Sequence, residues 1–112
     1  MQRKKSKKTR LANADEKRFM SWVKEQRCIQ CGNYPCHVDH AMGSTYRHNK
    51  VLIGMWYLLP LCGSCDEIKT NGSRRGFVNR FGLMSELWIK LIENYHSEIP
   101  KDVIDSILDS KT

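Results

Sequence analysis

Two short cysteine pairs place the strongest constraint on how this chain can fold. Cys28 and Cys31 form one C-x-x-C sequence, Cys62 and Cys65 form a second, and roughly 30 residues separate the two pairs. A tight turn of this kind presents two sulfur ligands, and two such turns complete the tetrahedral shell of a structural zinc site. We therefore expect zinc to join the pairs and to close the segment between them into a loop.

The length and the cysteine count agree with a small zinc-stapled domain. The chain has 112 residues and five cysteines, and so small a core is commonly reinforced by a metal or by disulfides. An odd count with C-x-x-C spacing favours zinc in a reducing compartment over a disulfide framework. A thiol redox protein would need one reactive pair near a βαβ pattern, so two matched pairs argue against that class. Cys36 is left over, and we expect it to be a free buried thiol.

The N-terminal residues are strongly basic and predict an arm that precedes a single domain. We assign residues 1–12 to this arm and residues 13–112 to the domain, since the arm lacks apolar periodicity. No apolar segment follows that would make a signal peptide or a membrane span, so no membrane partner is expected. The net charge of +7 favours a nucleic-acid partner; the alternative is a tail that only keeps the domain soluble. The expected phosphate contacts of the arm are Arg3, Lys4, Lys5, Lys7, Lys8 and Arg10.

Apolar periodicity and capping signals predict a mixed α+β domain. We expect helices over residues 13–27, 66–72, 74–80 and 84–96, and a last helix from Pro100. Strands are expected over residues 38–40 and 51–61, joined by a polar, basic loop over residues 41–50. The second strand can be broken at Gly54 and closed by Pro60. The loop and the third of these helices add four candidate nucleic-acid contacts, which are Arg47, Lys50, Arg74 and Arg75.

Four polar residues near the cysteines predict a hydrolytic site. Asp39 and Asp66 offer hard oxygen ligands that suit Mg²⁺ or Mn²⁺. His40 can take a proton from water, and Lys69, one helical turn after Asp66, can hold a phosphate oxygen. Asp39 and His40 are adjacent and can serve one site only if their strand ends or bends there. These parts together suit a one-metal phosphodiester hydrolase.

Each of these residues also has a simpler interpretation. Asp66 can be a favourable acid in a first helical turn, and His40 can be a zinc ligand or a histidine oriented by Asp39. His37 and Cys36 can form a second metal site.

The order of these motifs resembles the HNH, or ββα-metal, endonucleases of the zinc-knuckle type. That pattern has C-x-x-C, an Asp-His or His-His pair, then a second knuckle followed by Asn or His. Here it is present as Cys28 to Cys31, Asp39-His40, and residues 60–66 with the sequence Pro-Leu-Cys-Gly-Ser-Cys-Asp. The helix before the first knuckle and the Phe-Val-Asn-Arg-Phe-Gly segment at residues 77–82 are similar to phage Ref-type RecA-dependent nucleases.

The resemblance implies a zinc-stapled ββα core flanked by helices and a DNA endonuclease of phage or bacterial recombination and repair. His40 would be the base, Asp39 and Asp66 the Mg²⁺ or Mn²⁺ ligands, and DNA the substrate. The same likeness implies a recombinase filament as a partner and the cytoplasm of a bacterial or phage-infected cell as the location. Asp66 stands where the pattern has Asn or His, and Tyr57 stands where it often has an Asn that orients the base. A non-catalytic, zinc-stapled nucleic-acid-binding module is the alternative.

Overall fold

The computed structural model describes residues 12–112, and an antiparallel hairpin of strands β1 (His37–His40) and β4 (Leu58–Leu61) lies at its centre. Asp39 pairs with Leu59 and His40 with Leu58, and the Ala41 N–H extends this register by donating to the Tyr57 carbonyl at 3.0 Å. All four residues of β4 are buried. The fold is therefore α+β, with a buried strand that leads directly into the second cysteine pair.

Helix α1 (Ala14–Lys24) covers this hairpin and begins where the sequence predicts. Asn13 and Glu16 form a reciprocal capping box, which satisfies two backbone N–H groups that the helix leaves open. Phe19 and Val23 are fully buried, one turn apart. The Phe19 ring lies 5.5 Å from the Trp56 ring and 4.9 Å from the Tyr95 ring, measured between centroids. This aromatic cluster joins α1 to segments far along the chain.

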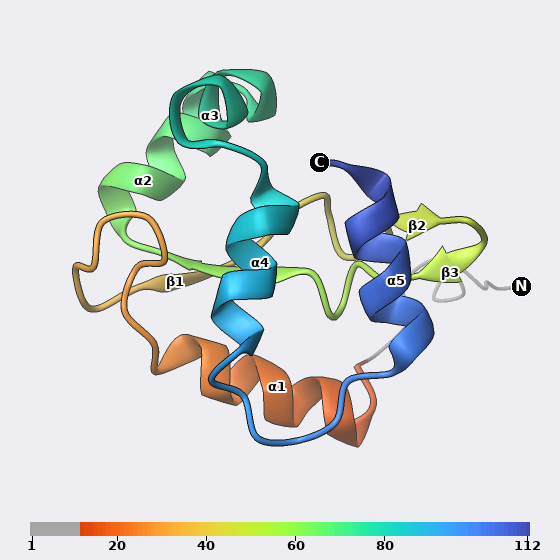
Figure 1. Ribbon diagram of the computed structural model, residues 1–112. Helices are drawn as coiled ribbons and strands as arrows, with labels where there is room; N and C mark the ends of the chain where they lie inside the picture. Colours follow the sequence, from red (N-terminus) through yellow and green to blue (C-terminus); the bar gives the residue numbers. More distant parts are fainter. Residues whose placement is uncertain (1–11) are drawn as a thin grey trace, which may run out of the picture.

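The chain after β4 is mostly helical (Figure 1). Helix α2 (Gly63–Glu67) continues into a π-helical turn, η2 (Ile68–Gly72), and then α3 (Arg74–Phe81), and these elements lie together at one end of the molecule. Helix α4 (Met84–Ile92) crosses the hairpin, and α5 (Lys101–Ser110) lies beside it next to the small hairpin of β2 (Arg47–His48) and β3 (Val51–Leu52). The Trp88 indole of α4 donates a buried hydrogen bond to the Trp56 carbonyl at 2.8 Å.

Residues 51–61 form two separate strands, with the break at Gly54 that the sequence allows. Strand β3 pairs with β2 and only β4 pairs with β1, so part of the expected loop is itself a strand. Gly54 explains the break: a Cβ there would lie 2.4 Å from the Gly43 carbonyl oxygen, so the backbone of the preceding turn passes directly over it. The chain then makes a hydrogen-bonded turn between Ile53 and Tyr57 before β4 begins.

The helix boundaries differ from expectation by a few residues. Helix α1 ends at Lys24, α4 ends at Ile92, and α2 begins inside the second cysteine pair with Cys62 as its N-cap. Within residues 12–112, no helix combines the length and the apolar character that a membrane crossing requires. The basic arm falls outside the described residues except for Ala12.

Candidate metal centre and catalytic site

The four paired cysteines come together at the base of the central hairpin. The sulfurs of Cys28, Cys31, Cys62 and Cys65 all lie within 4.8 Å of one another, and all four are free cysteines. Cys31 Sγ and Cys62 Sγ are 3.4 Å apart. A tetrahedral zinc with bonds of about 2.3 Å spaces its sulfurs about 3.8 Å apart. The cluster therefore has the composition and spacing that zinc requires, as the sequence predicts.

Backbone hydrogen bonds shape the two cysteine turns before any metal is considered. In the first turn, the Gly32 N–H donates to the Cys28 carbonyl at 2.9 Å, and Gly32 has a φ of 82°, a conformation that favours glycine. In the second, the Asp66 N–H donates to the Cys62 carbonyl at 2.8 Å, which starts α2.

Pro60 joins these two turns. The Ile29 N–H donates to its carbonyl at 2.9 Å, so the peptide group of Pro60 faces the first cysteine turn. Because N–H and C=O of one strand residue point to the same side, the missing N–H of Pro60 removes no hydrogen bond to β1.

The sulfurs differ in acidity because their surroundings differ. The backbone N–H of Cys65, followed by the Cys31 side chain, lowers the pKa of the Cys62 thiol to about 6. Burial is the largest cause that raises the pKa of Cys65, and its neighbouring sulfurs raise it further. Four adjacent sulfurs cannot all be thiolates without a cation, since like charges repel. A divalent ion would favour the thiolate form of all four.

The fifth cysteine lies outside this cluster. Its Sγ donates to the Asn33 carbonyl at 3.3 Å, and burial raises the pKa of the Cys36 thiol to about 11. Within residues 12–112, the four paired cysteines are the one group of three or more potential ligands close enough to share an ion. Cys36 is therefore a free, half-buried thiol, and the structure lends no support to a second metal site that contains His37.

Asp39 and Lys69 form a buried ion pair between the central hairpin and η2. Lys69 Nζ is 3.1 Å from Asp39 Oδ2 and 3.3 Å from Oδ1, and the two side chains are only 6% and 12% exposed. Asp39 Oδ2 receives no hydrogen bond of good geometry, so its contact with Lys69 is ionic. We expected the Lys69 ammonium to face a phosphate beside Asp66, but it points to Asp39 instead. The π-helical turn, which sequence periodicity does not reveal, carries Lys69 to this position.

His40 ends β1 at the point where the chain turns. The Gly43 N–H donates to the His40 carbonyl at 3.1 Å, so the bend that the sequence requires next to Asp39 is present. The half-buried imidazole of His40 makes no side-chain hydrogen bond with the described residues. The following residue, Ala41, is held on both sides, since its N–H donates to Tyr57 and its carbonyl accepts from Arg74 Nε at 3.3 Å.

Tyr57 is a core residue. Its ring is fully buried and lies edge-on to Trp88 with centroids 6.3 Å apart, and its hydroxyl hydrogen-bonds with the Thr112 hydroxyl. Burial raises the pKa of Tyr57 to about 12, although the bond to Thr112 opposes this shift. The Tyr57 hydroxyl is thus engaged away from His40 and does not orient it.

Asp66 lies in the first turn of α2 and is half-buried. Its Oδ1 accepts from the Thr70 hydroxyl at 3.1 Å, one turn along. Among residues 12–112, Asp39, His40 and Asp66 do not form a compact group of three ligands. The contact between Asp39 and Lys69 nevertheless holds the helical segment that contains Asp66 against the strand that contains the Asp-His pair.

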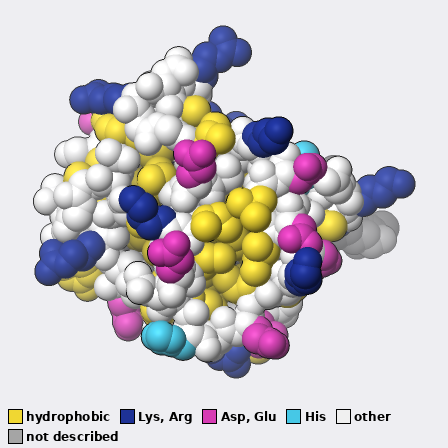
Figure 2. All heavy atoms as spheres, in the orientation of Figure 1, with side chains coloured by type: hydrophobic (Ala, Val, Ile, Leu, Met, Phe, Trp, Pro, Cys, Tyr) yellow, Lys and Arg dark blue, Asp and Glu magenta, His cyan; other side chains and the backbone are white. Residues whose placement is uncertain are grey.

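The four described basic residues that we expect to bind nucleic acid lie at two exposed places, whereas Lys and Arg side chains as a whole are scattered over the face that Figure 2 shows. Arg47 and Lys50 belong to the β2–β3 hairpin, and Arg74 and Arg75 begin α3. His48 Nε2 and Asn49 Nδ2 each lie 2.9 Å from Asp109 Oδ2, which fastens the hairpin to α5. The sequence gives no signal for this fastening or for the contact of Arg74 with Ala41, because both join distant segments. The basic arm lies outside the described residues.

Comparison with known proteins assigns the chain to a family. The model of the family described as "Protein of unknown function (DUF968)" matches residues 1–99. The chain belongs to this family. The matched range includes both cysteine pairs, the Asp-His pair and Lys69. No curated protein and no solved structure matches the chain.

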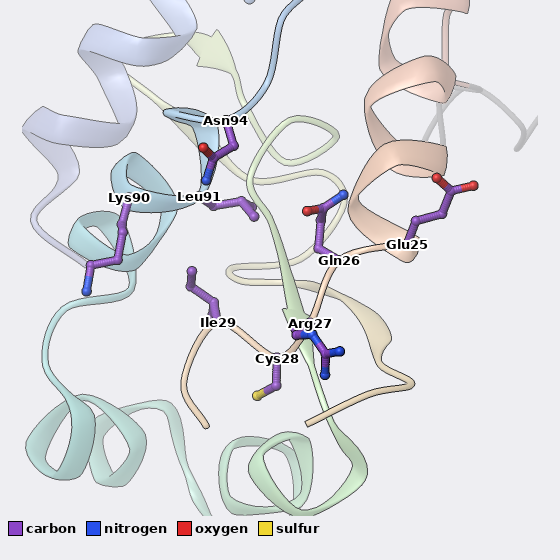
Figure 3. A pocket seen from close by; sticks show the side chains of 8 residues that line it. All are labelled: Glu25, Gln26, Arg27, Cys28, Ile29, Lys90, Leu91 and Asn94. Carbon is purple, nitrogen blue, oxygen red and sulfur yellow. The ribbon is translucent and has the colours of Figure 1, made fainter. Parts of the chain in front are cut away.

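A cleft of about 500 Å³ lies beside the first cysteine turn and was not anticipated from the sequence (Figure 3). One wall comes from the end of α1 and the first cysteine turn, and the other comes from α4 and the residues that follow it. Ile29 and Leu91 contribute apolar surface, while Arg27, Lys90 and Asn94 contribute polar groups. The two walls are more than 60 positions apart in sequence, so only the folded chain brings them together.

Proposed function

We propose that this chain is a metal-dependent DNA endonuclease of the HNH type, with a structural zinc at the base of a ββα-metal core. The observation that carries the proposal is the ion pair between Asp39 and Lys69. It joins the strand of the Asp-His pair to the helical segment that follows the second cysteine pair. Both residues of the ion pair are among those for which the sequence suggests hydrolytic chemistry, and this supports the proposal.

Asp39 and Asp66 are the residues that would hold a catalytic cation. The test of fit is Asp39 Oδ2, a buried carboxylate oxygen without a hydrogen bond. Carboxylates are the ligands that Mg²⁺ and Mn²⁺ prefer. Such an ion would stabilise the negative charge that develops on the leaving oxygen of a phosphodiester.

His40 would act as the general base. A neutral imidazole accepts a proton from water through a ring nitrogen near pH 7. No side chain among residues 12–112 forms a hydrogen bond with the His40 imidazole. The turn that His40 begins is held by Arg74 through Ala41, which would keep the ring in place relative to β1.

DNA is the polyanion that best suits the charge of the chain. The formal net charge is +7, and contacts to phosphates by Lys and Arg supply sequence-independent affinity. Arg74 and Arg75 are exposed at the start of α3, and Arg74 contacts the turn after His40. We propose that these arginines, Arg47, Lys50 and the basic arm bind the DNA backbone, and that a recombinase filament presents the substrate.

The decisive experiment is cleavage by a His40→Ala protein. Duplex, single-stranded, branched and recombinase-coated DNA should each be incubated with the parent protein and Mg²⁺ or Mn²⁺. Loss of a general base lowers the rate by about 10²–10⁴-fold, whereas zinc content and DNA affinity should stay unchanged. His96→Ala is the matched control, because His96 is exposed beyond α4. A His40→Ala protein that cleaves at the parent rate would refute the mechanism.

A zinc-stapled DNA-binding module without catalysis is the second candidate. The observation that favours it is that Asp39, His40 and Asp66 do not form a compact group of three ligands among residues 12–112. This candidate predicts that the parent protein binds DNA but cleaves none of the four substrates with either metal.

A further inference from the structure

The ion pair of Asp39 and Lys69 has a role of its own, and we infer that Lys69 is an internal counter-ion that a divalent cation displaces from Asp39. Lys69 would thereby set the metal affinity of the site as a positioning residue. This inference rests on the proposed function, because it concerns the same metal-binding carboxylate.

The first argument is the incomplete hydrogen bonding of the pair. A buried ion pair that serves only stability requires good geometry and partners for all its polar atoms, because removing two charges from water is costly. Asp39 Oδ2 is buried and has no such hydrogen bond, although Lys69 Nζ lies 3.1 Å away. An oxygen in this condition is ready to accept a stronger cationic partner.

The second argument is the local backbone of Lys69. Residues Ile68–Gly72 form a π-helical turn between α2 and α3. Such turns are rare and frequently occur at functional sites. Here the turn directs the Lys69 side chain inward to Asp39, where it is 6% exposed. The long aliphatic stem of lysine allows the ammonium to move away while the helix stays in place.

The third argument is the position of Asp66 in the same segment. Asp66 precedes Lys69 by one helical turn, and its Oδ1 is engaged by Thr70. Helix α2 contacts β1, so the two carboxylates belong to adjoining elements. A divalent ion brings one more positive charge to Asp39 than the ammonium does, and the Asp66 carboxylate would balance it.

Mn²⁺ titration of the zinc-loaded protein tests this inference without measuring cleavage. Binding should be followed by electron paramagnetic resonance in the parent and in Lys69→Met, which removes the charge and keeps most of the side-chain volume. The dissociation constant should fall by at least about tenfold in Lys69→Met, because the competing charge next to Asp39 is gone. Lys101→Met is the control, since Lys101 forms an exposed pair with Asp105 at 3.0 Å, and its Mn²⁺ affinity should equal that of the parent.

A second measurement uses the parent protein and needs no substitution. Acylation of lysines by a water-soluble acetylating reagent should be followed at Lys69 and Lys101 by mass spectrometry. MnCl₂ should raise the rate at Lys69 by at least about tenfold, because the displaced amine leaves its buried ion pair, and should leave Lys101 unchanged.

The outcomes separate the inference from the proposed function. If the parent binds Mn²⁺ but Lys69→Met binds it equally or more weakly, the exchange is wrong and the endonuclease proposal stands. If Lys69→Met does not fold, an unchanged acylation rate at Lys69 in saturating Mn²⁺ overturns the exchange. If neither protein binds Mn²⁺, both the exchange and the metal-dependent mechanism are wrong.

Discussion

Substitution of Cys62 by serine should remove the zinc and most of the stability of the domain. Cys62 is buried and caps α2, and its sulfur lies 3.4 Å from the sulfur of Cys31. Among backbone bonds of the first cysteine turn, that from Ile29 to Pro60 reaches the hairpin directly. That hydrogen bond and the cysteine cluster both connect the first turn to the hairpin.

The magnitude follows from the size of the loop that zinc closes. Cys31 and Cys62 are 31 positions apart, and a cross-link over a loop of that length removes about 4 kcal/mol of chain entropy from the unfolded state. The whole binding energy of structural zinc is larger, about 10–16 kcal/mol in finger peptides at pH 7. A domain of this size has a free energy of unfolding of about 5–15 kcal/mol. The loss of about 4 kcal/mol from loop closure alone corresponds to a fall in Tm of about 15–30 °C.

The assay combines metal analysis with calorimetry. The parent should contain one zinc per chain, and Cys62→Ser should contain little zinc and either melt at a much lower temperature or be unfolded. Cys36→Ser is the matched control, because this thiol lies outside the cluster; its zinc content should be unchanged and its stability should stay within about 1 kcal/mol of the parent. A folded parent without zinc, or a Cys36→Ser protein that loses it, would refute the reasoning.

Three further predictions concern the surface and the core. Deleting residues 1–10 should weaken DNA binding on all sequences alike and flatten the dependence of log K on log salt, by about 0.9 per lost duplex phosphate contact; an unchanged slope would leave the arm only a solubility role. The hydrogen bond from His48, followed by that from Asn49, lowers the pKa of Asp109. This contact therefore stabilises the β2–β3 hairpin above the ordinary Asp range and is lost as pH falls through the lowered pKa. The protection of the hairpin amides against hydrogen exchange, corrected for the intrinsic rate, should therefore fall in acid, and Asp109→Asn should lose that pH dependence. Trp88→Phe should cost about 1–3 kcal/mol in denaturant unfolding, because it removes the buried indole hydrogen bond to the Trp56 carbonyl, which keeps only the Leu58 N–H as donor, and leaves a cavity where the larger ring was; a cost near zero would contradict this.

Local sequence signals predicted the elements that depend on neighbouring residues. Asn13 and Glu16 specify the start of α1 because both capping hydrogen bonds close within three positions. The C-x-x-C spacing predicted the two cysteine turns for the same reason, and the four sulfurs do cluster. Gly54 was recognised as a place where the strand can break, but the reason for the glycine, the close passage of the backbone at Gly43 and Ser44, is visible only in the fold.

For the candidate catalytic residues too, the sequence predicted the positions that depend on neighbouring residues. Adjacency in sequence puts Asp39 and His40 together at the end of a strand, and C-x-x-C followed by Asp puts Asp66 in the first turn of α2. Their roles in hydrolysis, and those of Mg²⁺ or Mn²⁺ and DNA, stay predictions. Helical spacing alone placed Lys69 beside Asp66, because a regular helix was assumed; the π-helical turn changed its direction.

By itself, the sequence determined the cysteine frame, the capped first helix and the strong positive charge, because each depends on residue type and on spacing over a few positions. Tertiary structure alone decided that Lys69 meets Asp39, that Tyr57 is buried against Trp88, and that Arg74 holds the turn after His40. The physical reason is distance along the chain. These contacts join residues about 30 positions apart, where burial and the matching of charges depend on how whole elements pack.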